Sequence, residues 1–542
     1  MKKYLIGLDF GTLSVRALLM DAETGEEVAI SESVYPHAVM DQALPSGKRL
    51  PARYALQHPK DYLDGLKQTV SDAMKQAGIQ KEAVVGLCID FTTCTVVAMN
   101  EDGVPLCLLD EFSDDPHAYV KLWKHHGALD YAEEINQKAE ERGERWLASY
   151  GGKISCEWML PKVLETLRES PDVYGATARF ADAGDWLSFL LTGKHTAAAG
   201  FAGLKTLWNA EYGFPSNEFF KAVDPRLDGI MGTKLCDDVY PSGSCVGTLT
   251  ARGAELTGLC EGMPVGAPLV DGGSPMAALC VTEPGELSLV VGTSNVDHVL
   301  TKEGKEIPGV CGYVKGSIVP EYYTIEAGQA GAGDTFSWFV HNCIPRAYEE
   351  EAAALGMSIH AYLRQKASAL RIGESRLIAL DWFNGNRSIL KDDALSGMIL
   401  GLTLKTRPEE IYRALIEATA FGTRMIVDNF EAHGVAIDGI CVAGGIAQKD
   451  PMMMQIYADV TNKEMRVVDS AQAAARGSAI YAAVAAGLFA DVTTAAKHYA
   501  LPDKAYYHPI PENVTAYDKL YSEYKTLHDY FGRGGNDVMK RL

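Results

Sequence analysis

Two segments half a chain apart share one pattern of apolar runs and polar turns, and this constrains the fold most. Near the start, apolar runs flank the turn Asp9–Ser14; from Glu286, apolar runs flank the turn Gly292–Asn295. A charged turn follows both pairs, and Gly292 lies 281 positions after Gly11 (292 − 11). Strand, tight turn and strand predict a β-meander. We therefore expect a duplicated fold with a hinge between two domains.

Outside the two meanders, helical and strand patterns alternate. The segment Thr406–Glu409 has capping-box spacing with a proline in the first turn, and it predicts a long helix that ends before Gly434. A buried strand is expected over 439–443, and a further helix from Asp450-Pro451. The Ala-rich stretch 471–487 has small residues suited to close helix packing. With 542 residues the chain can hold two cores, and the alternation predicts the α/β class.

Composition and charge exclude several classes of protein. A formal net charge of −21 argues against a nucleic-acid or anionic-membrane partner, because phosphates would be repelled. Eleven scattered cysteines indicate neither a disulfide scaffold nor a zinc motif. Asp9 interrupts the first apolar run too early for a signal peptide, and no apolar run is long enough to span a bilayer. We expect a cytoplasmic protein.

The two Gly-Thr turns are candidate phosphate-binding hairpins. Backbone N–H groups and hydroxyls in such turns can surround a phosphate group. Asp9, at the end of the first strand, offers a hard oxygen to Mg²⁺, through a water molecule. Each turn alone could be an ordinary β-turn with locally satisfied polar groups. Together, facing each other across a cleft, they would hold the β- and γ-phosphates of a nucleotide.

Asp271 is the candidate general base. It follows the apolar run that ends at Val270 and precedes the helical pattern Pro275–Cys280, which is where open α/β sheets place ligands. Phosphoryl transfer to an alcohol needs a carboxylate that accepts the hydroxyl proton. The alternative is that Asp271 caps this helix.

Gly444-Gly445 would let a flat ring such as adenine approach the backbone, although a tight strand-to-helix turn would also explain the pair. His125-His126 could suggest a metal site. Adjacent helical residues point in different directions, however, whereas ligands on one helix are three or four residues apart. We therefore interpret these histidines as unrelated to metal binding.

At this point the motifs resemble those of the FGGY carbohydrate kinases, in the same order over essentially the whole chain. The matching segments are Asp9–Arg16, Tyr150–Trp158, Gly397–Glu417 and Gly444-Gly445. Longer and more specific strings resemble the members that phosphorylate L-ribulose, namely Leu122–Lys124, Leu204–Trp208, Ile325–Gln329 and Leu380–Gly385.

The resemblance implies an α/β fold of two actin-like (ribonuclease H-like) domains, closing about a hinge over an interdomain catalytic cleft that binds ATP, Mg²⁺ and sugar. Residues 1–283 would form the sugar-binding domain with the catalytic Asp, and residues 284–542 the nucleotide-binding domain. It leaves a homodimer open. The expected reaction converts L-ribulose to L-ribulose 5-phosphate, a step of L-arabinose catabolism.

By the same resemblance, Asp271 is the base and, with Asp9, lies at the metal. The implied sugar-binding residues are Thr93, Cys94, Trp123, Lys205, Asp271 and Glu326. The implied nucleotide-binding residues are Thr12, Ser14, Arg16, Gly292, Thr293, Gly333, Ser337, Gly444, Gly445 and Lys449. Lys205 and Glu326 offer a donor and an acceptor to sugar oxygens, and Trp123 an apolar wall. A surface Lys, a surface Glu and a core Trp are the ordinary alternatives.

One departure from the family pattern lies beside the base. Family members often carry Gln, Ala or Cys after the catalytic Asp, and the ribulose-specific ones a His two positions on. Here Gly272 and Gly273 follow, which loosens the backbone and removes a contact to sugar or phosphate. Other substrates within the class are D-ribulose, xylulose, ribitol and glycerol. From another class, an actin-like core could be a chaperone-type ATPase that uses nucleotide to change shape.

Overall fold

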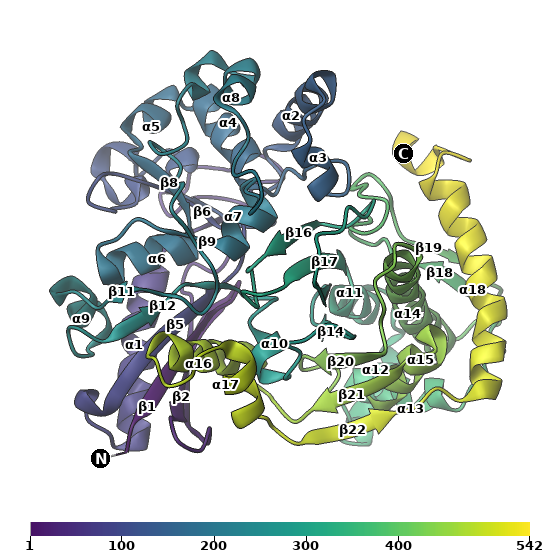
Figure 1. Cartoon of the computed structure of the whole chain (residues 1–542). Helices are drawn as coiled ribbons and strands as arrows, with labels where there is room; N and C mark the ends of the chain where they lie inside the picture. The colour runs from purple at the N-terminus through teal and green to yellow at the C-terminus, as the bar shows by residue number, and fades with distance from the viewer. Residues whose placement is uncertain (1) are drawn as a thin grey trace.

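The computed structural model describes residues 2–542, and its core consists of two mixed seven-stranded sheets, one in each half of the chain (Figure 1). The first sheet contains β1 (Tyr4–Phe10), β2 (Ser14–Asp21), β3 (Glu27–Val34), β5 (Val84–Phe91), β11 (Cys245–Thr248), β12 (Pro264–Gly266) and β13 (Leu269–Val270). The second contains β14 (Glu286–Val291), β15 (Asn295–Thr301), β16 (Gly312–Lys315), β17 (Tyr323–Gln329), β20 (Gly439–Ala443), β21 (Glu464–Val468) and β22 (Asp503–Tyr507).

The two sheets share one strand order, which confirms the predicted duplication. In the first sheet the order β3-β2-β1-β5 joins an antiparallel meander to a parallel strand. In the second sheet β17-β15-β14-β20 repeats it. Each sheet also carries an antiparallel edge strand, β11 or β22, at the far side. This is the α/β, actin-like (ribonuclease H-like) arrangement expected from the sequence.

The second meander differs from the prediction in its third strand. The strand after the charged turn, β16, does not pair with β15; β17 takes that place and pairs with β15 along its whole length. All seven residues of β17 are buried, whereas Lys315 of β16 is exposed. A short strand with a charged exposed residue suits the sheet edge, and a fully buried one suits the interior.

The Ala-rich helix α16 (Ala473–Ala485) lies in the C-terminal part of the chain but packs on β1, β2 and β5 of the first sheet (Figure 1). Gly7 makes this approach possible, since a Cβ there would lie 1.9 Å from the Ala475 carbonyl oxygen. Helix α10 (Pro275–Ala278) packs on α16 beside it. The predicted close packing is therefore confirmed, and it joins the two halves.

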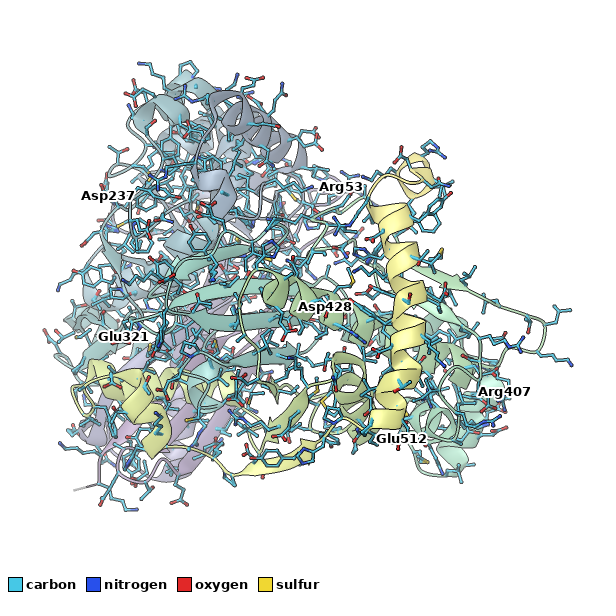
Figure 2. The ribbon with its side chains drawn as sticks, turned by 45° about the vertical axis from the view of Figure 1, so that its right-hand side comes forward. Arg53, Asp237, Glu321, Arg407, Asp428 and Glu512 are labelled. Carbon is cyan, nitrogen blue, oxygen red and sulfur yellow. The ribbon has the colours of Figure 1, made fainter. Side chains whose placement is uncertain are left out.

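Helices cover the outer faces of both sheets. On the first sheet lie α1 (Pro59–Ala77) and α6 (Ala183–Thr192), and α9 (Ala251–Thr257) packs against both of these helices. The second half contains α11 (Gly333–Cys343), α12 (Arg346–Ala354), α13 (Ile359–Ser368), α14 (Pro408–Ala432), α15 (Pro451–Thr461), α17 (Val492–His498) and α18 (Pro511–Gly532). Figure 2 shows α18 along the outer side with Glu512 at its start and Asp428 of α14 behind it; Tyr521 Oη donates to Asp428 Oδ2 at 2.7 Å.

The long helix α14 begins one residue later than its predicted cap. Arg407, not Thr406, is the N-cap residue, and its backbone N–H donates to Glu410 Oε2 at 2.6 Å. Thr406 instead closes the preceding turn, where its Oγ1 accepts from the Thr403 N–H at 2.9 Å.

Additional elements enlarge the first half. They include a four-stranded sheet of β4 (Leu56–Gln57), β6 (Val96–Met99), β7 (Val120–Lys121) and β8 (Arg179–Asp182), with helices α2 (Leu129–Arg142), α3 (Trp146–Ser149), α4 (Met159–Glu169), α5 (Pro171–Ala176), α7 (Ala199–Lys205) and α8 (Asn217–Val223). A smaller pair in this half is β9 (Ala197–Ala198) with β10 (Val239–Tyr240), and the second half has a similar pair, β18 (Ile378–Leu380) with β19 (Met398–Leu400). The chain ends in α19 (Val538–Arg541).

The domain boundary between residues 283 and 284 stays a prediction. Within residues 2–542, no helix has both the length and the apolar character needed to cross a bilayer.

Candidate active site

A cavity of about 550 Å³ is lined by residues from both halves of the chain. The predicted residues in its wall are Thr12, Thr93, Cys94, Trp123, Lys205, Asp271, Thr293 and Glu326. All the predicted sugar-binding residues are therefore brought together, with one threonine from each Gly-Thr hairpin. The remaining predicted residues lie outside this wall.

Three carboxyl groups meet at the ends of adjacent strands of the first sheet. Parallel β1 and β5 place Asp9 beside Asp90, and β13 runs parallel to β5, so that Asp271 follows at the same edge. Burial raises the pKa of Asp9 and raises that of Asp90 well above its usual range. Arg16 pairs with Asp9 at 3.2 Å. A cluster of buried carboxyl groups with raised pKa values suits a hard divalent cation.

Asp90 was not predicted, because it lies inside an apolar run and looks like part of a buried strand. Its carboxyl is fully buried, and Ser478 Oγ of α16 donates to its Oδ2 at 2.7 Å. Its Oδ1 has no hydrogen-bond partner among the described residues. Asp90 therefore connects the strand-end cluster to the helix that joins the two halves.

Asp271 does not cap the following helix. The N-cap residue of α10 is Ser274, and Asp271 Oδ1 accepts from the Gly272 N–H at 2.7 Å instead. Burial, with the nearby charge of Asp9, raises the pKa of Asp271 to about 7. A carboxylate with such a pKa in a cavity wall has the basicity that a general base needs near neutral pH.

Gly272 and Gly273 have a packing role beside the base. A Cβ at Gly272 would lie 3.1 Å from Val296 Cγ1, and one at Gly273 would lie 2.6 Å from Ile318 Cδ1. The backbone beside Asp271 is therefore closely packed and not loose as expected. The two glycines leave room for side chains from the second half of the chain.

Lys205 and Glu326 form a buried ion pair across the cavity. Lys205, the last residue of α7, donates from Nζ to Glu326 Oε1 of β17 at 2.6 Å. Although burial opposes ionisation of Glu326, Lys205 and His298 hold its pKa well below the usual range. The surface alternatives for these two residues are excluded, because both side chains are less than a tenth exposed.

Trp123, Thr93 and Cys94 also line the cavity. Trp123 Nε1 donates to Thr12 Oγ1 at 3.1 Å, which connects the predicted sugar wall to the first hairpin. Thr93 Oγ1 is buried and has no hydrogen-bond partner among the described residues. Cys94 has a positive φ of 58°, and its carbonyl accepts from Lys162 Nζ at 2.6 Å. Trp123 thus lines the cavity and also packs against a neighbouring hydrophobic cluster.

The first hairpin presents Thr12 to the cavity, whereas Ser14 and Arg16 are not part of its wall. Ser14 Oγ donates to Glu32 Oε1 at 2.8 Å, and Arg16 pairs with the same oxygen at 2.8 Å. Their predicted contact with phosphate remains a prediction. The hairpins also differ in length: Phe10 pairs with Val15 in the first, whereas Val291 pairs with Asn295 in the second.

Of the nucleotide-binding residues predicted in the second half, Gly333 and Gly444 pack on the second hairpin. The Gly333 N–H, at the start of α11, donates to the Gly292 carbonyl at 3.0 Å, and a Cβ there would lie only 2.5 Å from that oxygen. Gly444 (φ 109°) packs equally closely on Val291, whereas a Cβ at Gly445 would meet no atom within 4 Å. Ser337 lies one turn further along α11, and Lys449 is exposed after the glycine pair.

Sequence reasoning missed a charged group at the cavity rim. His126 pairs with Glu157 at 3.1 Å, and Arg387 lies over the Trp123 ring at 5.8 Å. Although burial opposes it, His126 and Arg387 lower the pKa of Glu157 to about 2. These residues come from three separate segments; Glu157 lies in the motif Tyr150–Trp158, but no local pattern predicted that the three would meet. His125 instead contacts Glu165, so the two adjacent histidines have different partners.

Lys391 ties the two halves together at the same rim. Its Nζ donates to the carbonyls of Tyr150 (2.5 Å) and Lys153 (2.7 Å) in the first half and of Val310 (3.1 Å) in the second. The segment Tyr150–Trp158, which was singled out as a motif, thus supplies both cavity residues and this connection.

The sequence profiles of the FGGY family of carbohydrate kinases match residues 4–280 with their N-terminal domain and residues 287–486 with their C-terminal domain. The chain belongs to this family. Two solved structures have the same fold. A xylulose kinase from Lactobacillus acidophilus superposes with a TM-score of 0.80 at 18% sequence identity, over 98% of this chain and 99% of that one. A xylulose kinase from Rhodospirillum rubrum superposes with a TM-score of 0.79 at 22% identity, over 97% of this chain and 98% of that one.

Curated relatives are more similar in sequence. A ribulokinase of Halalkalibacterium halodurans is 49% identical over 100% of this chain and 97% of its own length. A ribulokinase of Bacillus licheniformis is 47% identical over 98% and 97%, respectively.

Proposed function

We propose that the chain is an ATP-dependent ribulokinase that phosphorylates the terminal hydroxyl of L-ribulose, giving L-ribulose 5-phosphate and ADP. The observation that carries this proposal is the position of Asp271, in the wall of a cavity that also contains Lys205, Glu326 and the threonines of both hairpins. Relatives named ribulokinase, 46–49% identical over nearly the whole chain, support the substrate.

In the proposed reaction Asp271 accepts the proton of the sugar's terminal hydroxyl. The hydroxyl oxygen forms a bond to the γ-phosphorus, and the bond from that phosphorus to the β–γ bridging oxygen breaks, so that ADP leaves with the electron pair. Lys205 donates to a sugar oxygen and Glu326 accepts from a hydroxyl, which positions the chain of the sugar. Trp123 covers its apolar side.

The carboxyl cluster fits Mg²⁺, since its donors are hard oxygens with raised pKa values. Asp9, through water, and Asp271 would hold the ion, which when bound neutralises charge on the β- and γ-phosphates. Gly292, Thr293 and the Gly444-Gly445 turn would lie along the nucleotide, because the second sheet brings them to one edge.

We place the reaction in the cytoplasm, in L-arabinose catabolism. All eleven cysteines are free, which agrees with a reducing compartment, and ATP is available there. The other ketopentoses and polyols are not favoured, because relatives similar at this level over the full length carry the ribulokinase name.

The test is a panel of L-ribulose, D-ribulose, D-xylulose, ribitol and glycerol, assayed for ADP release at matched concentrations with ATP and Mg²⁺. We expect kcat/KM to be highest for L-ribulose, with negligible ADP release when no sugar is present. A higher kcat/KM for another compound of the panel would contradict L-ribulose as the substrate but would leave the assignment as a kinase in place. A fast ATPase without sugar would contradict the expected closure of the two domains, which keeps water away from the γ-phosphate.

A further inference from the structure

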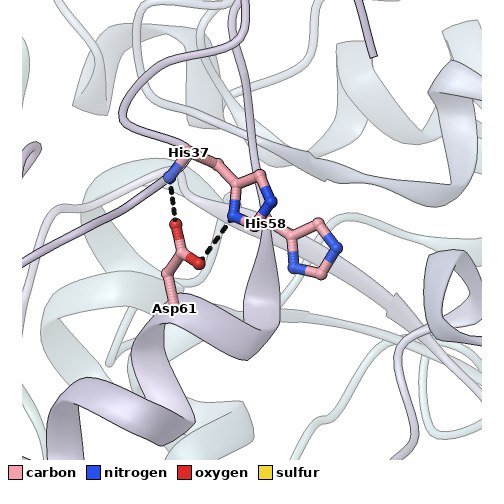
Figure 3. Close-up of side chains that lie close together, drawn as sticks. All are labelled: His37, His58 and Asp61. Atoms are coloured by element: carbon pink, nitrogen blue, oxygen red, sulfur yellow. Dashed lines mark hydrogen bonds and ion pairs between the residues drawn. The ribbon is translucent and has the colours of Figure 1, made fainter. Parts of the chain in front are cut away.

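A second cluster of metal-ligand side chains lies outside the cavity, at the start of α1. His37 follows β3, His58 is the N-cap residue of α1, and Asp61 lies in its first turn (Figure 3). One potential ligand atom from each residue lies within 4.8 Å of the other two. No role in the proposed kinase reaction accounts for this arrangement.

The carboxylate of Asp61 is held in one orientation. Its Oδ2 accepts from the backbone N–H of His37 at 3.0 Å, while its Oδ1 faces His37 Nδ1 at 2.8 Å, as Figure 3 shows. Asp61 is only 5% exposed, whereas the His37 side chain is 37% exposed. The cluster therefore combines a fixed, buried oxygen ligand with an imidazole open to solvent, which gives an ion a path to the site.

The His58 ring completes the group. It stacks on the His37 ring with centroids 4.4 Å apart and planes 17° apart. Bonds of about 2.0–2.1 Å to a tetrahedral ion require ligand atoms about 3.3 Å apart, whereas these three atoms lie within 4.8 Å of one another. His58 Nδ1 accepts from the Lys60 N–H at 3.4 Å, so binding an ion requires His58 to move inward and to use Nε2 or give up this bond.

Local charge separates this cluster from the other His/carboxylate group in residues 2–542, which consists of His117, Glu165 and Glu169. In that group Lys121 Nζ donates to Glu165 at 2.5 Å, so the positive charge of the lysine side chain already lies where a metal ion would bind. At the His37 cluster the nearest lysine of the same helix, Lys60, instead pairs with Asp64.

We propose that His37, His58 and Asp61 bind one divalent transition-metal ion of the zinc class. Two imidazole nitrogens and one carboxylate oxygen suit Zn²⁺ or Co²⁺, whereas Mg²⁺ and Ca²⁺ prefer sites made of oxygen ligands. Water would fill the fourth position. The ion would fasten the loop after β3 to the start of α1.

This site lies next to the first hairpin. Gln57, adjacent to His58, donates from Nε2 to the Thr12 carbonyl at 2.7 Å, and the Tyr35 N–H donates to the Leu13 carbonyl at 2.9 Å. The loop after β3 and the start of α1, which the ion would join, thus both contact the turn of the first hairpin.

The test is Zn²⁺ binding to the full-length protein without a polyhistidine tag, measured by competition with a chromogenic chelator in excess Mg²⁺. The background variant Cys245→Ser/Cys343→Ser removes the two exposed thiols. We expect one tight site in this background, a loss of at least about 100-fold in affinity for His37→Ala and for Asp61→Asn, and no change for Glu169→Gln in the other cluster.

His37→Ala alters a partly exposed side chain, so its fold should persist; matched circular-dichroism melting curves check this. Co²⁺ in place of Zn²⁺ should give the visible bands of a four-coordinate nitrogen–oxygen site, and His58→Gln should abolish them. Zn²⁺ binding weaker than millimolar in the background protein would overturn the proposal. Equal affinity in His37→Ala, Asp61→Asn and the background would overturn it as well.

Discussion

Lys205 Nζ lies 2.6 Å from Glu326 Oε1, and this contact joins the two halves of the chain inside the proposed sugar cavity. Its partners come from α7 and β17, 121 residues apart, and both are nearly inaccessible to water. A buried pair of this kind is costly to break, because the remaining charge has no solvent to stabilise it.

Lys205→Met should therefore affect both stability and sugar binding. We expect a loss of about 3–5 kcal/mol in the free energy of unfolding and a rise of about 100-fold in KM for the sugar, with KM for ATP little changed. Denaturant titration and initial-rate kinetics measure the two effects. In the double variant Lys205→Met/Glu326→Gln stability should return while sugar affinity stays low. A sugar KM within twofold of the wild type would contradict the assignment.

The raised pKa of Asp271 predicts an acid limb in the pH profile. The base works as the carboxylate, so the active fraction grows as pH rises through about 7. With ATP saturating and Mg²⁺ low enough for protons to compete with it at Asp271, kcat/KM for the sugar should fall about tenfold from pH 8 to pH 6, and more Mg²⁺ should move the limb to lower pH. The variant Asp393→Asn, which changes a different cavity carboxyl of raised pKa, should keep this limb. A flat profile in the wild type would argue against Asp271.

The glycine pair offers a matched test of the nucleotide site. Gly445→Ala adds a methyl group where no protein atom lies within 4 Å, so it should leave the melting temperature unchanged but raise KM for ATP about tenfold. Gly444→Ala places its methyl 2.2 Å from the Val291 carbonyl oxygen at a positive φ, and it should destabilise the second sheet. An unaltered ATP KM in Gly445→Ala would show that the nucleotide does not lie there.

Lys391 should control how well the closed cavity excludes water. Lys391→Met removes three hydrogen bonds to carbonyls of both halves, each worth about 1.5–3 kcal/mol for a charged donor before compensation. We expect sugar-independent ATPase activity to rise severalfold. Lys153→Met is the control, because only the backbone carbonyl of Lys153 takes part. Unchanged ATPase activity in Lys391→Met would mean that this contact does not restrain opening.

The sequence predicted correctly those elements that depend on residues close together in the chain. The duplicated meander, α14 and the close packing of α16 follow from apolar periodicity and small residues, and Asp271 from its position between strand and helix. Which strands pair with each other is not visible in local patterns. The structure pairs β17 with β15, where the sequence predicted the strand after the charged turn, because the fully buried strand lies inside the sheet. Glu157, His126 and Arg387 meet only through tertiary structure, and Asp90 is hidden within an apolar strand.

The most direct test of the central claim is the turnover of Asp271→Asn. With L-ribulose, ATP and Mg²⁺ saturating, kcat should fall by about 10²–10⁴-fold, while calorimetry shows ATP bound with near wild-type affinity. The variant should melt no lower than the wild type at pH 8, because it removes a buried charge. A kcat close to that of the wild type in this variant would contradict the role of Asp271 as the base of a sugar kinase.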